Sequence, residues 1–316
     1  MIELHHAEQV AAACGGDDLL VWTAQRLPAG GARAWSHGDS VAVACPAVSK
    51  HDRLAVFGAA GDPAQAELVR QVWREMGTGY RPFGDREVIH RLVEAMPEEL
   101  GPAGNFTWMT VDPDTVRLDG SAPLESSTRG SDPRGPDTAG PDTARQNAGR
   151  LEAGRLEAGP ASASGPRGEK PRSAAAGFAG PAVLVRPGVR WLDPGAEPEV
   201  AQVLAVANPD AYARPGMPGV TRWAGVRDDA GRLVAVGADA WSAPTVGFVG
   251  GVATLPQARG SGLAGAICRF LTATLLDRHG RVSLMVDDVN AAALAVYRRL
   301  GYARRPVAAT RAVQEA

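Results

Sequence analysis

The feature that most constrains the fold is a strand, a glycine turn and a helix that follow one another near the C-terminus. Residues 246–254 are rich in β-branched and small side chains, which favours a central strand ending before Pro256. Gly260 and Gly262 follow. Apolar residues then recur at three- and four-residue spacing, as on one face of a buried helix: Leu263, Ile267, Phe270, Leu271 and Leu275. Because glycines let backbone N–H groups approach an anion and the helix dipole adds attraction, this order predicts a phosphate-binding turn.

A second strand and helix follow and strengthen this prediction. A lone Gly-x-Gly turn is a weak signal in a chain with 38 glycines. Residues 283–286 have the character of a short strand, and residues 290–300 that of a helix capped by Asn290 and closed by Gly301. From Asn290 to Tyr302 the spacing is N-x-x-A-x-x-x-Y-x-x-x-G-Y.

Together these segments resemble the acyl-CoA-binding half of the GCN5-related N-acetyltransferase (GNAT) family. The resemblance implies an α/β fold, with a mixed central sheet flanked by helices in the C-terminal domain. It also implies an N-acyltransferase in which an amine attacks the thioester of acetyl-CoA directly, without a metal ion. The acceptor would be the amine of a small molecule or of a protein.

The resemblance also assigns roles to individual residues. Backbone amides of the turn and of the next helix would hold the CoA pyrophosphate: Gln257, Arg259, Gly260, Ser261, Gly262, Leu263 and Ala264. Backbone groups of Val252 and Thr254 would bind the pantetheine arm and polarise the thioester carbonyl. Asn290 would contact the same cofactor, and Tyr297 matches the residue that protonates the leaving thiolate. The residues themselves also allow Asn290 to be a helix cap only, and Tyr297 to be a core residue.

The base that would deprotonate the acceptor amine is not marked by a motif. Asp239, Asp287, Asp288 and a water molecule held by Thr254 are the candidates. For Asp287 and Asp288 we favour a role in a polar turn between strand and helix.

The rest of the C-terminal domain, which we assign to residues 179–316, also has recognisable elements. A helix is predicted over residues 197–206, and a hairpin turn at 228–231 joins two strands. Between them, residues 208–219 contain three prolines and Tyr212. In the GNAT family this region helps to form the wall of the acceptor site.

The N-terminal region, residues 1–124, is predicted to be a smaller α/β domain. Strands are expected at 40–45 and 53–57, a helix from Pro63 to Gly77, a second helix after Asp85, and a closing strand at 106–109. We interpret it as a degenerate GNAT-like half, because it lacks the glycine turn and the Asn-to-Tyr helix. It would shape the acceptor cleft or form the interface of a homodimer. Residues 125–178 are rich in Gly, Pro, Ala and Arg, and are predicted to be a disordered linker.

Composition argues against several other classes. A net charge of −2 gives no basic surface for nucleic acid. No signal peptide or apolar run long enough to cross a membrane is visible, and Cys14, Cys45 and Cys268 have no metal-ligand spacing. We therefore expect a cytoplasmic protein that does not bind membranes. The alternative function is a non-catalytic acyl-CoA sensor or scaffold. Phosphoryl transfer is disfavoured, because the glycine turn lacks a following Lys-Ser/Thr pair.

Overall fold

The computed structural model describes residues 1–27, 30–118 and 188–313. The linker predicted at 125–178 lies outside these residues. The described residues before and after the linker form a single compact unit. That unit contains twelve strands in one sheet. No helix in the described part of the chain is long and apolar enough to span a membrane.

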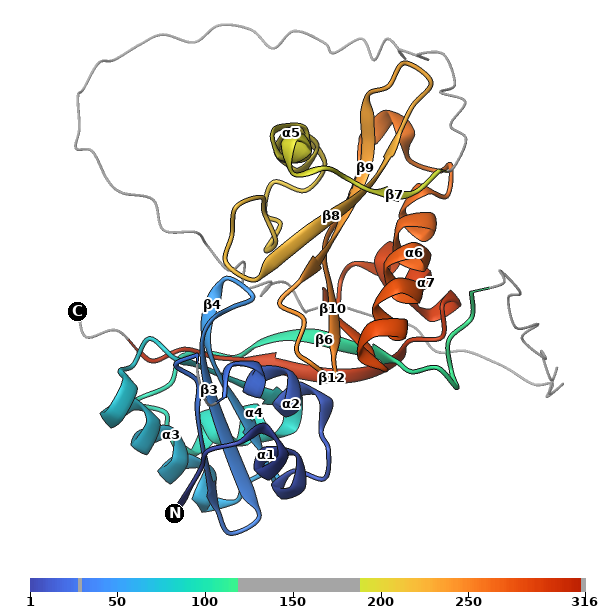
Figure 1. Ribbon diagram of the computed structural model, residues 1–316. Coiled ribbons are helices and arrows are strands. Elements are labelled where there is room, and N and C mark those ends of the chain that lie inside the picture. Colours follow the sequence, from blue (N-terminus) through green and yellow to red (C-terminus); the bar gives the residue numbers. More distant parts are fainter. Residues whose placement is uncertain (28–29, 119–187, 314–316) are drawn as a thin grey trace, which may run out of the picture. The chain divides into compact units, whose positions relative to one another are not determined.

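The two parts of the chain repeat one pattern of elements (Figure 1). The N-terminal half contains β1 (Ile2–Leu4), α1 (Ala7–Ala13), α2 (Asp18–Thr23), β2 (Arg33–His37), β3 (Ser40–Val48), β4 (His51–Phe57), α3 (Pro63–Met76), β5 (Arg81–Asp85), α4 (Arg86–Ala95) and β6 (Gly104–Val111). The C-terminal half contains β7 (Arg190–Trp191), α5 (Glu197–Ala207), β8 (Val220–Arg227), β9 (Leu233–Ala240), β10 (Gly247–Thr254), α6 (Leu263–His279), β11 (Val282–Asp287), α7 (Ala291–Arg299) and β12 (Ala303–Ala309). In each half, two parallel strands flank one long helix, and a second helix leads to the last strand.

The last strands of the two halves are exchanged. The strand order is β1-β2-β3-β4-β5-β12-β6-β11-β10-β9-β8-β7. Strand β12 therefore lies between β5 and β6 of the N-terminal half, while β6 lies between β12 and β11. Residues 106–109, predicted to close an N-terminal sheet, instead lie at the centre of a sheet to which both halves contribute. Each half thus supplies a strand that the other needs for its backbone hydrogen bonds.

Aromatic side chains from both halves share one core. The ring of Trp22 on α2 stacks on Phe248 of β10 with 4.7 Å between ring centroids, and meets Trp108 of β6 edge-on at 5.3 Å. Its indole N–H donates to the carbonyl of Trp241 at 2.8 Å. Because Trp22 is fully buried, this hydrogen bond satisfies a polar group that would otherwise be costly to bury. The three cysteines are also buried and free.

Several helix boundaries follow the predicted caps. Asp62 accepts a hydrogen bond from the N–H of Ala64, with Pro63 in the first turn of α3. Asn290 caps α7, and Gly280 ends α6 in the left-handed region at φ 74°. The sequence missed short or irregular elements, including β1, α1, α2, β2, β5 and β12.

Candidate functional site

Strand β10 bends at a bulge and separates there from its parallel neighbour. It pairs with β11 at Gly247 and Phe248, and the ladder stops beyond that point. Its register with β9 shifts between Gly250 and Ala253. Gly251 has a φ of +61°, and a Cβ there would come within 2.6 Å of the Trp223 ring. Glycine is therefore required by both conformation and space, and the bulge opens the edge of β10 toward β11.

The predicted phosphate turn lies between the end of β10 and the start of α6. Gly260 and Gly262 have φ values of +80° and +78°, and a Cβ at either position would meet no atom within 4 Å. No described side chain caps α6, because the hydroxyl of Ser261 donates back to the carbonyl of Ala258 at 2.6 Å. The first amides of this 17-residue helix, including those of Leu263 and Ala264, are therefore available to an anion.

The other predicted contacts with the cofactor surround this turn. Gln257 is exposed, and Val252 is half-buried within the bulge. Arg259 is exposed, and its Nε donates to the carbonyl of Thr254 at 3.2 Å, so its side chain folds back over the end of β10. The hydroxyl oxygen of Thr254 is buried, and no hydrogen-bond partner for it is present among the described residues. Such an orphaned polar atom fits a site that a polar ligand or water completes.

Asn290 acts as a helix cap in this structure. Its Oδ1 accepts a hydrogen bond from the N–H of Ala293 at 3.0 Å, and the residue is exposed at the C-terminal side of β11. Capping uses only the oxygen, and among the described residues no partner is shown for the side-chain amide N–H groups.

Tyr297 packs into the core with its hydroxyl toward α6. Its side chain is 8% exposed, and its ring lies 5.8 Å from that of Tyr302 between centroids. The Cys268 thiol of α6 is a neighbour of this hydroxyl and is itself buried. Burial, reinforced by the neighbouring Cys268, raises the pKa of Tyr297 well above 10, so the phenol keeps its proton at neutral pH. A protonated phenol can donate a hydrogen bond to a thiolate.

Two of the candidate bases, Asp239 and Asp288, have structural partners. Asp239 is buried, accepts a hydrogen bond from Ser242 Oγ at 2.5 Å, and lies 3.6 Å from the guanidinium of Arg222. Asp288 binds Arg86 at 2.5 Å and accepts from Thr107 Oγ1 at 2.6 Å. Both partners of Asp288 belong to the N-terminal half, so this carboxylate ties the turn after β11 to that half. Asp287 is exposed.

The predicted phosphate turn has no counterpart at the corresponding place in the N-terminal half, between β4 and α3. Strands β4 and β5 stay paired up to Val56 and Gly84, and a Cβ on Gly84 would lie 2.4 Å from the carbonyl oxygen of Val56. The carboxylate of Asp62 occupies the N-terminus of α3, where an anion would bind. Hydrogen bonds from Ser40 and from the Ala64 amide lower the pKa of Asp62, so its negative charge is stabilised. A phosphate bound here would be repelled by the Asp62 carboxylate, and β4 and β5 do not separate as β10 and β11 do.

The structure thus brings together the predicted phosphate turn and the bulge of β10 on one helix–strand pair. It places Tyr297 against the same helix, at Cys268. Sequence reasoning missed the bulge, although two consecutive glycines inside a predicted strand, Gly250 and Gly251, are a recognisable signal for one. Among the described residues, no group of His, Cys, Asp or Glu side chains is arranged to hold a metal ion.

Comparisons with known proteins find relatives for part of this chain. The family model described as FR47-like protein matches residues 225–312. Mycothiol acetyltransferase from Salinispora arenicola (strain CNS-205) is 48% identical over 63 residues, which is 19% of this chain and 20% of that relative. The chain therefore matches only about a fifth of the curated relative's length.

Solved structures share the fold. A GCN5-related N-acetyltransferase from Sphaerobacter thermophilus has a TM-score of 0.50 at 14% identity, covering 98% of this chain and 92% of that one. A second, from Kribbella flavida, has a TM-score of 0.49 at 17% identity, covering 90% of each chain. The Sphaerobacter likeness supports the fold alone and extends over both halves. Together with the FR47-like match at residues 225–312, it shows that the C-terminal part of this chain is similar to GNAT acetyltransferases and shares their fold.

Proposed function

We propose that this protein transfers an acetyl group from acetyl-CoA to an amine by direct attack. The observation that carries the proposal is the uncapped N-terminus of α6, preceded by Gly260 and Gly262 and placed just beyond the bulge of β10. When bound, acetyl-CoA supplies the acetyl group as a reactive thioester. Its diphosphate carries the charge that these amides favour.

The chain's own residues would then have separate tasks. The amides of Gly262, Leu263 and Ala264 would hold the phosphates, with Arg259 adding positive charge. Backbone groups of Val252 and Thr254, on the opened part of β10, would bind the pantetheine arm and the thioester oxygen. The orphaned hydroxyl of Thr254 would hold a water molecule at the same place.

Tyr297 would stabilise the departing sulfur. Its hydroxyl, which has Cys268 as a neighbour in the free protein, would face the thiolate. Because burial raises the pKa of Tyr297 well above 10, while a free thiol titrates near about 8.5, complete proton transfer would be unfavourable. We therefore assign Tyr297 a hydrogen bond to the leaving thiolate, which takes its proton from solvent. The attacking amine would lose its proton to solvent through the water molecule held by Thr254.

Two aspartate variants test the phosphate turn. In Gly262→Asp, a carboxylate at the start of α6 would repel a phosphate, and the left-handed φ of +78° adds backbone strain that the control shares. Gly280→Asp is the matched control, because Gly280 has a similar φ of +74° at the other end of the same helix and a Cβ there also meets no atom within 4 Å.

The measurement is thermal unfolding with and without acetyl-CoA. At 100 times the dissociation constant, a ligand adds about 2.7 kcal/mol to the native state, which is about 5–10 °C for a chain of this size. We expect this shift in the wild type and in Gly280→Asp, and its loss in Gly262→Asp. An unchanged shift in Gly262→Asp would refute the assignment of the turn.

The alternative is a sensor that binds acetyl-CoA without reaction. It is distinguished by release of free CoA thiol in the presence of an amine panel. Binding without amine-dependent release across that panel would favour the sensor.

A further inference from the structure

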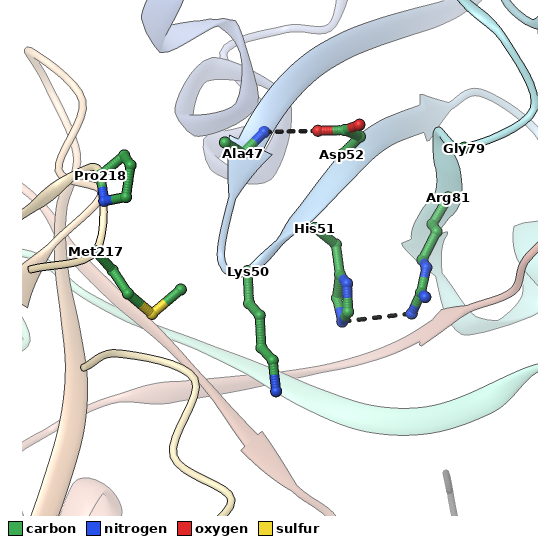
Figure 2. Close-up of a pocket in the computed structure, with 8 residues that line it drawn as sticks. All are labelled: Ala47, Lys50, His51, Asp52, Gly79, Arg81, Met217 and Pro218. Atoms are coloured by element: carbon green, nitrogen blue, oxygen red, sulfur yellow. Dashed lines mark hydrogen bonds between the residues drawn. The ribbon is translucent and has the colours of Figure 1, made fainter. Parts of the chain in front are cut away.

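A cavity lies next to the β3–β4 hairpin of the N-terminal half. Its volume is about 350 Å³, and it is lined by Ala47, Lys50, His51, Asp52, Gly79, Arg81, Met217 and Pro218. Met217 and Pro218 come from the segment between α5 and β8, so both halves contribute to the wall (Figure 2). In the same view, the side chains of Lys50, His51 and Arg81 extend in a common direction.

The hairpin that carries Lys50 has an unusual backbone. Val48 pairs with His51, which leaves Ser49 and Lys50 as a two-residue turn. Their φ values are +52° and +68°, and Ala47 has a φ of +53°. Such turns favour glycine and asparagine, so side chains larger than glycine are held here at a conformational cost. The Asp52 carboxylate accepts a hydrogen bond from the Ala47 N–H at 2.8 Å and supports the bent backbone.

Positive charge around this cavity is not balanced by the described carboxylates. Arg53 is only 5% exposed, its guanidinium lies 5.3 Å from the Phe83 ring centroid, and its Nε is buried with no hydrogen-bond partner among the described residues. Arg53 is the register neighbour of Arg81 across β4 and β5. The described ion pairs include none for Lys50, Arg53 or Arg81, and Asp52 is the acidic residue in the lining.

The titration of the buried groups reflects the same excess of charge. Burial lowers the pKa of His51 to about 3, and the cations Arg53, Arg81 and Lys50 add to the effect. Burial also lowers the pKa of Arg53 to about 10, with a further contribution from Arg81. His51 is therefore neutral, and its Nε2 lies 3.3 Å from Arg81 Nη1. A buried arginine without a counter-ion is costly unless an anion completes its surroundings.

One loop joins this cavity to the proposed acetyl-transfer site. The ring of Tyr212 meets His51 edge-on at 5.9 Å between centroids, and Lys50 Nζ lies 5.8 Å from the centre of the Tyr212 ring. The next residue, Ala213, packs on the bulge of β10, where a Cβ on Gly250 would lie 3.2 Å from the Ala213 methyl carbon. Tyr212 contacts residues of the cationic cavity, and Ala213 contacts the bulge of β10, so these two residues connect the two places.

We propose that the acceptor carries an oxyanion, a carboxylate or a phosphate group, that binds to Lys50 and Arg81 in this cavity. Its amine would then reach the bulge of β10 past Tyr212 and Ala213. The inference rests on the proposed function, and it gives the N-terminal half a role in holding the acceptor. Guanidinium groups match the geometry of carboxylates and phosphates, and binding of either would neutralise the charge around Arg53.

The first test is calorimetric titration of the full chain saturated with acetyl-CoA, so that the phosphate turn is already occupied. Inorganic phosphate and succinate are the two probes, which separate a phosphate site from a carboxylate site. We compare the wild type with a Lys50→Gln/Arg81→Gln variant. The control is Arg190→Gln/Arg311→Gln, which removes the same charge from two exposed residues outside the cavity.

We expect one probe to bind saturably to the wild type, and about tenfold more weakly or less to the Lys50→Gln/Arg81→Gln variant, as is typical for loss of charged hydrogen bonds. The control should bind as the wild type does. Equal binding to all three proteins, or no binding of either probe, would overturn the inference. If the acetyl-CoA shift in thermal unfolding is present while oxyanion binding is absent, only this inference fails; if the shift is absent, the proposed function fails.

The second test uses amines in matched pairs, such as ethanolamine with O-phosphoethanolamine and tyramine with tyrosine. The member with the oxyanion should be acetylated with a kcat/KM at least about tenfold higher, and the Lys50→Gln/Arg81→Gln variant should remove this preference through KM. Equal rates within every pair that reacts would contradict the proposal.

Discussion

Replacement of Arg305 by methionine should lower the free energy of unfolding, because Arg305 holds β12 against the N-terminal half. Arg305 lies on β12 and binds carboxylates of the N-terminal half. Its Nη1 is 2.6 Å from Asp17 Oδ2, and its Nε and Nη2 lie 2.7 Å and 3.0 Å from the two oxygens of Asp85. Asp18 lies 3.6 Å away and also accepts a hydrogen bond from the Trp108 indole at 2.8 Å. Methionine keeps most of the apolar stem and removes the charge.

The expected loss follows from how deeply each group is buried. Removing one partner of a fully buried ion pair costs about 3–5 kcal/mol, whereas an exposed pair contributes at most about 1 kcal/mol. The side chains of Asp17 and Asp18 are 10% and 14% exposed, while those of Arg305 and Asp85 are 25% and 45% exposed. The burial of Arg305 and its partners lies between these two limits. We therefore expect a loss of about 2–3 kcal/mol in the free energy of unfolding, or about 5–10 °C in Tm.

Urea unfolding at pH 7 and pH 4 measures this loss. Burial raises the pKa of Asp17 even with Arg305 beside it, and without Arg305 that pKa should rise further. An acid whose folded pKa lies above its unfolded value destabilises the fold at high pH, and this penalty disappears as the acid is protonated. The deficit of Arg305→Met should therefore be smaller at pH 4 than at pH 7.

The neighbouring Arg304→Met is the matched control. Arg304 is exposed, and its guanidinium makes a hydrogen bond of 3.4 Å to Thr107 Oγ1. It should change the free energy of unfolding by no more than about 0.5 kcal/mol. If the two variants were equally stable at pH 7, or if the Arg305→Met deficit grew at pH 4, the ion-pair reasoning would be refuted.

Two further predictions concern the candidate site. Asn290→Ala should cost about 1 kcal/mol of stability through loss of the cap, whereas Asn290→Asp keeps the capping oxygen. A KM for acetyl-CoA that rises in both variants would show that Asn290 contacts the cofactor. An unchanged KM would show that Asn290 is a helix cap only. Tyr297→Phe should lower kcat by about 100-fold, as for loss of one hydrogen-bond donor to a developing anion, with little change in acetyl-CoA binding or Tm. Because the pKa of Tyr297 is raised well above 10, wild-type kcat should show no loss from this group as pH rises toward 10. Equal kcat in Tyr297→Phe and the wild type would remove Tyr297 from the reaction.

Much of the local structure around the candidate site was predictable. The cap at Asn290, the left-handed stop at Gly280 and the start of α3 at Asp62 and Pro63 were all expected and are confirmed. Each depends on residues within one helical turn, where side-chain hydrogen bonds and allowed φ values decide the outcome. For the same reason, the order of strand, glycine turn and helix near residues 247–279 could be inferred before any contact was known.

Strand β12 shows why the rest of the fold could not be predicted from the sequence. Residues 303–309 contain two arginines and Pro306, and they lack the apolar alternation of a strand. They become extended because β6 pairs along their whole length, and β5 pairs only from Val307 onward, after the proline. A proline that cannot donate to a ladder is tolerated where one side of the strand is unpaired.

The sequence by itself therefore determined the local elements and the type of domain at the C-terminus, because these depend on neighbours along the chain. Only the tertiary structure decided that β6 and β12 are exchanged between the halves, and that Lys50 and Arg81 lie near Met217 of the other half. Those arrangements depend on contacts between residues far apart in the sequence, and on burial that selects one pairing among many.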